Sequence, residues 1–141
     1  MEKRILPIFA LILILGGISV YQGLPLRNPD SYRAAAYSPS ELEELIRKNP
    51  DKYALIDVRT REEYDEAHLP GAIHADYYDT EALKKAAGDK IPITYCAFSA
   101  MRGPYAAYQL YQDGFKNVGV LDGGISAWAE DTLTVESLDP T

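Results

Sequence analysis

Residues 91–104 read IPITYCAFSAMRGP, and this stretch contains the change from strand to loop to helix that decides the fold. Ile91 to Tyr95 is a short apolar run of the kind that forms a buried strand. Cys96 to Arg102 follows as a loop of mostly small residues, and Gly103-Pro104 opens a helix that we expect to extend to about Asp113. The pattern predicts a strand–loop–helix unit with a cysteine at the carboxyl end of the strand.

Short apolar runs and helical segments alternate on both sides of this unit. Two segments begin with capping boxes, Ser38 with Glu41 and Thr60 with Glu63, which mark helix starts. The remaining pattern predicts strands at 53–56, 72–75 and 118–121, and helices at 39–48, after Thr60, at 81–87, and around Ile125 and Trp128. Strands that alternate with helices predict an α/β fold with a mostly parallel central sheet flanked by helices. Ligands of such sheets bind beyond the carboxyl ends of the strands, which is where Cys96 lies.

The loop has the composition of an anion-binding site built around a nucleophile. Successive N–H groups of Ala97, Phe98, Ser99, Ala100 and Met101 can surround an anion, and the helix that follows adds the positive end of its dipole. Both effects favour the thiolate of Cys96, the reactive form of a cysteine. Arg102 offers a planar fork of donors for an oxyanion. We therefore take Cys96 as the candidate nucleophile and residues 97–102 as the substrate-binding loop. The alternative is an inert core thiol beside an exposed arginine.

Composition limits the partners and cofactors of the chain. Its 141 residues suffice for one domain, and a net charge of -7 argues against nucleic acid as a partner. The single cysteine excludes an intramolecular disulfide, and the two histidines, His68 and His74, are too few for a zinc site. We expect no metal and no cofactor. Because no second thiol is present, a modified Cys96 needs an external thiol acceptor or reductant.

Residues 1–26 have the pattern of a membrane segment. Lys3 and Arg4 precede an apolar run from Ile5 to Tyr21, which, continued to Leu26, is long enough to span a bilayer of about 30 Å. The basic residues predict a cytoplasmic N-terminus, so one transmembrane helix would hold the domain outside the cytoplasmic membrane. A cleaved signal, giving a secreted or periplasmic protein, is the alternative. We assign residues 27–37 to a linker, 38–130 to the globular domain and 131–141 to a polar, frayed tail.

Two segments resemble the rhodanese superfamily of single-domain sulfurtransferases. The first contains Leu55-Ile56-Asp57-Val58-Arg59, then Glu63-Tyr64, then His68-Leu69-Pro70-Gly71-Ala72-Ile73, and the second reads VLDGGISAW at residues 120–128. The resemblance covers about residues 38–130. It implies the rhodanese fold, with Cys96 as the residue that forms a covalent intermediate. We interpret Asp57 and Arg59, at a strand end, as a supporting ion pair that braces the loop.

The loop itself resembles that of a different branch of the superfamily. In most single-domain rhodaneses an arginine, when present, comes five residues after the cysteine, whereas Arg102 comes six after Cys96. This spacing, with Phe98-Ser99 and Gly103-Pro104, is similar to the cell-division-cycle dual-specificity phosphatases and the related arsenate reductases. Ala97 and Met101 stand where those phosphatases carry acidic residues, so the loop supplies no carboxylate to protonate a leaving oxygen.

Three functions follow from these resemblances. The first is a sulfurtransferase that carries a sulfane sulfur as a Cys96 persulfide and passes it to a nucleophilic acceptor. The second is a cysteine-dependent phosphatase or arsenate reductase, in which Arg102 clamps the oxyanion. The third is a non-catalytic module with the rhodanese fold. The first two imply a small anionic or sulfur-containing substrate, and the third implies a bound partner or anion.

Overall fold

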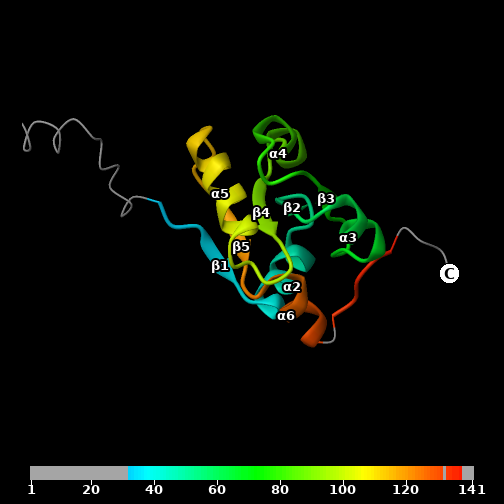
Figure 1. Cartoon of the computed structure of the whole chain (residues 1–141). Coiled ribbons are helices and arrows are strands. Elements are labelled where there is room, and N and C mark those ends of the chain that lie inside the picture. Colours follow the sequence, from blue (N-terminus) through cyan, green and yellow to red (C-terminus); the bar gives the residue numbers. More distant parts are fainter. Residues whose placement is uncertain (1–31, 132, 138–141) are drawn as a thin grey trace, which may run out of the picture. The chain divides into compact units, whose positions relative to one another are not determined.

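A computed structural model describes residues 32–131 and 133–137, and within them the sheet has five parallel strands in the order β1-β5-β4-β2-β3 (Figure 1). In chain order the elements are β1 (Ala35–Tyr37), α2 (Pro39–Lys48), β2 (Tyr53–Asp57), α3 (Arg61–Glu66), β3 (Ile73–His74), α4 (Thr80–Ala87), β4 (Ile91–Tyr95), α5 (Arg102–Gln112), β5 (Gly119–Leu121) and α6 (Gly124–Glu130). The predicted α/β class and parallel sheet are confirmed.

Helices cover both faces of the sheet, and this explains the continuous apolar runs of its strands. In Figure 1, α4 and α5 lie on one face, and α2 and α6 lie on the other. Ile56 and Val120 point into the core beneath α4 and α5, together with Leu83 and Leu110. The neighbouring residues on the strands, Leu55 and Leu121, point into the opposite core, which contains Leu42, Ile93, Tyr95 and Trp128. Successive strand residues therefore face opposite layers, as the pleat of a strand requires.

The central strand β4 positions the candidate nucleophile. It pairs with β2 along its whole length and with β5 on its other side, and it ends at Tyr95. Tyr95 is fully buried, and its hydroxyl accepts a hydrogen bond of 3.1 Å from the Leu69 N–H. Burial raises the pKa of Tyr95 far above its ordinary value, so the side chain stays a neutral phenol. Cys96 thus leaves the sheet from a central strand that is paired on both sides.

Both capping boxes form as the sequence predicts. The Ser38 hydroxyl accepts from the Glu41 N–H, and the Thr60 hydroxyl accepts from the Glu63 N–H at 3.2 Å. In each case the glutamate carboxylate accepts from the backbone N–H of the capping residue. These local bonds fix the starts of α2 and α3 without help from distant residues.

Two boundaries differ from the sequence-based expectation. Residues 27–37 were expected to form a linker, but Ala35–Tyr37 form the edge strand β1, paired with Gly119–Leu121 of β5. The tail was expected to fray after residue 130, yet Glu136 forms an antiparallel bridge with His68 through two hydrogen bonds of 2.8 Å. Both segments are too short or too polar to signal a strand by themselves, and their order comes from pairing with residues far away in the sequence.

The expected membrane segment, residues 1–26, lies outside the described residues. Among residues 32–131 and 133–137, no helix is long and apolar enough to cross a bilayer.

Candidate active site

Cys96 lies at the carboxyl end of β4 and begins the loop that leads into α5. The thiol belongs to a residue that is only 5% exposed, at the edge of the core beneath α4 and α5. It is a free cysteine. The side chains of Phe98 and Met101, in contrast, are each 70% exposed. A buried thiol under an exposed loop admits a small reagent more readily than a bulky one.

The base of the loop is held by the start of α6. The Ile125 N–H donates to the Cys96 carbonyl at 3.0 Å, and the Ser126 N–H donates to the Ala97 carbonyl at 3.1 Å. Gly124 makes this approach possible, because its φ is +63° and a Cβ added there would lie 2.2 Å from the Cys96 oxygen. The glycine pair after Asp122 is therefore a structural part of the site.

The loop N–H groups are available to a ligand. Among the described residues, the N–H groups of residues 97–101 donate to no backbone or side-chain acceptor. Ser99 has a φ of +50°, and a left-handed residue within a tight loop is typical of backbone nests that bind anions. The Ser99 hydroxyl is buried without a hydrogen-bond partner. Because α5 starts at Arg102, its positive end adds to the same field. That residues 97–101 bind an anion stays a prediction.

Arg102 forms an ion pair with Glu63. Its Nη1 lies 3.3 Å from Glu63 Oε2, and the two side chains are 27% and 34% exposed. Desolvation by itself raises the pKa of Glu63, but the Thr60 N–H and the Arg102 guanidinium outweigh it, so the pKa is lowered. Glu63 is thus an anion at neutral pH, held by its cap and directed at Arg102. It is the carboxylate that sequence reasoning missed, because its role in the capping box explained its presence.

Asp57 and Arg59 form the predicted ion pair, but they brace a different part of the fold. Arg59 Nη2 lies 2.6 Å from Asp57 Oδ2, both side chains are buried, and the guanidinium also donates to the Ala67 carbonyl. Burial opposes the charge of Arg59, yet the hydrogen bonds and negative charge of Asp57 prevail and raise its pKa. The contacts tie the end of β2 to the turn after α3, whereas the Cys96 loop is held by α6.

The two histidines make structural contacts. His68 Nδ1 lies 2.8 Å from the Tyr64 carbonyl, and its ring stacks on Tyr64 with centroids 3.9 Å apart. His74 Nε2 lies 2.9 Å from the Arg59 carbonyl. Within residues 32–131 and 133–137, no three His, Cys, Asp or Glu side chains are placed to hold a metal ion.

Comparison with known proteins agrees with this geometry. The family model described as "Rhodanese-like domain" matches residues 38–131. Arsenate reductase 2.1 of Oryza sativa is 34% identical over 110 residues, which cover 68% of each chain. The M-phase inducer phosphatase cdc-25.2 of Caenorhabditis elegans is 46% identical over 70 residues, 44% of this chain but only 14% of that protein.

A solved structure extends the similarity to three dimensions. A Bacillus halodurans protein is 31% identical and superimposes with a TM-score of 0.65, covering 74% of this chain and 78% of that one. The family model covers most of the chain, and the fold and the position of Cys96 are those that the sequence motifs imply. The chain belongs to the rhodanese-like domain family.

Proposed function

We propose that the chain is a sulfurtransferase that carries sulfur on Cys96. The observation that supports this most is the buried thiol of Cys96 at the start of a loop whose N–H groups, in residues 97–101, donate to no acceptor in the described structure. Such a nest stabilises a negative charge on sulfur, either the thiolate that attacks or the persulfide that results. The same loop supplies no acidic side chain, and sulfur transfer needs none.

The reaction takes place in two displacements. The Cys96 thiolate attacks the outer sulfur of a donor such as thiosulfate, the donor S–S bond breaks, and sulfite leaves with the bonding electron pair. An external thiolate then attacks the terminal sulfur of the persulfide, and Cys96 leaves as a thiolate. Neither step protonates an oxygen leaving group, which suits a loop of alanine, phenylalanine, serine and methionine.

Chemistry on a tetrahedral oxyanion is the second candidate, and the six-residue step from Cys96 to Arg102 favours it. Two relatives of the chain, an arsenate reductase and a phosphatase, give it further support. Against phosphatase chemistry stands the loop itself, because residues 97–101 supply no carboxylate to protonate a leaving oxygen.

Intact mass spectrometry of the full chain separates the two candidates. After exposure to thiosulfate, we expect Cys96 to gain the mass of one sulfur atom, and a thiol acceptor to remove it. Exposure to an aryl phosphate should leave no phosphoryl adduct. A phosphoryl adduct on Cys96 without any sulfur adduct would reverse the choice between them.

Substitutions at the Arg102–Glu63 pair test what the arginine does. Arg102→Lys retains the charge but loses the fork, so loading from thiosulfate, itself an oxyanion, should slow by about 2 kcal/mol of activation free energy. Discharge of a persulfide already formed should change little. Glu63→Gln, which frees the guanidinium, should speed loading. Separate single-turnover rates for loading and discharge measure both effects, and unchanged loading in both variants would show that Arg102 binds no oxyanion.

We further propose that residues 1–26 anchor the chain in the cytoplasmic membrane with the domain outside. The supporting observation is the charge-free run from Ile5 to Tyr21 after Lys3 and Arg4. A tagged full chain should fractionate with membranes and be digested by protease added outside the membrane. A chain recovered from the cytoplasm without membranes would contradict the proposal, and a shortened chain released outside would support the cleaved signal instead.

A further inference from the structure

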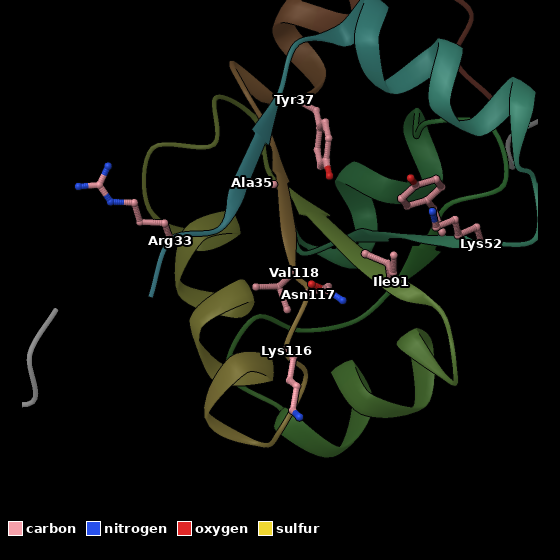
Figure 2. A pocket seen from close by; sticks show the side chains of 9 residues that line it. Arg33, Ala35, Tyr37, Lys52, Ile91, Lys116, Asn117 and Val118 are labelled. Carbon is pink, nitrogen blue, oxygen red and sulfur yellow. The ribbon is translucent and has the colours of Figure 1, made fainter. Parts of the chain in front are cut away.

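A cavity of about 380 Å³ lies at the end of the sheet opposite Cys96. Apart from Tyr37, the last residue of β1, its lining comes from the connections into the strands and from the first residues of the strands: Arg33, Ala35, Tyr37, Lys52, Tyr53, Ile91, Lys116, Asn117 and Val118. Figure 2 shows the Tyr37 ring beside β1, the Arg33 side chain pointing away from it on the other side of that strand, and Lys116 on the segment that leads into β5. The lining includes three cations and no carboxylate, in a chain whose net charge is -7.

These three cations have no ion-pair partner among the described residues. Two lysines elsewhere in the domain are paired, Lys48 with Glu44 at 2.7 Å and Lys84 with Asp113 at 2.8 Å, whereas Lys85 and Lys90 have no ion pair among the described residues either. Lys48 and Lys84 also lie in the last turns of their helices, where the helix dipole favours a positive charge. Arg33, Lys52 and Lys116 precede strands instead, so neither helix dipoles nor ion pairs account for them. All three are exposed.

Two tyrosines make this surface amphipathic as well as basic. Tyr37 and Tyr53 are half-buried in the cavity wall, and Lys52 Nζ lies 5.6 Å from the centre of the Tyr53 ring. Burial and the nearby Tyr53 raise the pKa of Tyr37, so its hydroxyl stays neutral. Tyrosine beside lysine or arginine is the combination that proteins place at the interface between water and lipid.

The chain enters the domain at this same end. Tyr32 packs between Tyr108 and Tyr111 of α5, with ring centroids 5.4 and 4.7 Å away, and its burial raises its pKa to about 12. Tyr32 comes only six residues after Leu26 in the sequence. Six residues span at most roughly 20 Å, so a bilayer that holds residues 1–26 lies within that reach of Tyr32. Since β1 runs parallel to the other strands, their first residues lie on the side where the chain enters.

We propose that this surface, formed by Arg33, Lys52 and Lys116 with Tyr37 and Tyr53, docks on the headgroups of anionic phospholipids. The anchor brings the surface to the bilayer, and the cations then hold the domain with the amino ends of its strands toward the lipid. Cys96, at the carboxyl ends, consequently faces away from the membrane. The inference rests on the proposed membrane anchor and does not depend on the reaction at Cys96.

The test uses the full chain in lipid nanodiscs, with one fluorophore on an introduced cysteine. In a Cys96→Ser background, Asn117→Cys places the probe at the cavity, and Glu62→Cys places a control probe near the start of α3, at the other end of the sheet. A spin label on the lipid headgroup reports proximity by quenching. In discs of phosphatidylcholine with phosphatidylglycerol, we expect strong quenching at position 117 and weak quenching at 62. Discs of phosphatidylcholine alone should remove most of the difference.

A matched pair of charge reversals identifies the cations as the cause. Lys116→Glu should lower the excess quenching, measured through a probe at Ala36→Cys, by about fivefold or more, since each basic residue near an anionic surface contributes about that factor. Arg61→Glu makes the same change in net charge at the opposite end of the sheet, and it should leave the quenching unchanged. Raising the salt concentration should imitate Lys116→Glu.

Several results would overturn the proposal. Equal quenching at positions 117 and 62, or the same difference in neutral and anionic discs, would show that no oriented docking occurs. Inorganic phosphate that displaces the domain from anionic discs at low concentration would identify a site for small anions instead. Failure of the full chain to assemble into either disc would remove the anchor on which the docking depends. Sulfur loading of Cys96 is measured separately in detergent, so its result tests the proposed reaction independently of the proposed docking.

Discussion

Cys96→Ser is expected to lower the rate of sulfur loading from thiosulfate by at least about a thousandfold. A serine hydroxyl is a far poorer nucleophile toward sulfur than a cysteine thiol, so the variant lacks the group that attacks the donor. Serine is close to cysteine in size, so the loop should retain its shape. The measurement is the rate at which the full chain gains the mass of one sulfur atom.

The control must separate lost chemistry from lost folding. Cys96 is only 5% exposed, and a serine hydroxyl buried without a partner costs about 1–3 kcal/mol of stability. Cys96→Ala removes the nucleophile without adding a buried hydroxyl, and it should be as inactive as the serine variant. Thermal unfolding of both variants shows whether the domain is folded in the assay. Sulfur loading that survives in a folded Cys96→Ala variant would mean that Cys96 is not the nucleophile.

Gly124→Ala should unfold or severely destabilise the domain, although residue 124 takes no part in the chemistry. The new Cβ would lie 2.2 Å from the Cys96 carbonyl oxygen and 2.6 Å from the Ala97 oxygen, both backbone atoms that other contacts hold in place. Strain at a φ of +63° adds to this clash. Together the two effects should lower the free energy of unfolding by about 3 kcal/mol or more. For a domain of this size, the melting temperature should fall by roughly 10 °C or more.

Gly71→Ala is the matched control, because Gly71 has a similar φ of +72° but no atom within 4 Å of its added Cβ. Gly71→Ala introduces backbone strain without a clash, so it should lower the free energy of unfolding by about 1–2 kcal/mol. If Gly124→Ala and Gly71→Ala have the same melting temperature, the start of α6 does not lie as close to the Cys96 loop as the structure shows. A folded remainder of Gly124→Ala should also load sulfur slowly, because the bonds from Ile125 and Ser126 position the nucleophile.

The sequence alone determined the order of the elements, their type and the position of Cys96 at the end of β4. Apolar periodicity and capping boxes depend on residues within about four positions of one another, so they can be recognised in the sequence without knowledge of the fold. For this reason α2, β2, β4 and the start of α3 match the prediction within a residue or two. The motifs at residues 55–73 and 120–128 likewise identified the family that the comparisons show.

Only the tertiary structure decided which distant residues meet. Arg102 meets Glu63 across 39 positions, the Cys96 carbonyl meets the Ile125 N–H, and the His68 backbone meets that of Glu136. The linker segment 35–37 becomes a strand because β5 offers it an edge. The residues near each of these positions in the sequence do not predict the contact. They predict only a helix cap, a turn, a linker or a tail, and each of those accounts for the residue without a distant partner. Their pairing depends on the packing of helices on both faces of the sheet, and that packing exists only once the whole chain has folded.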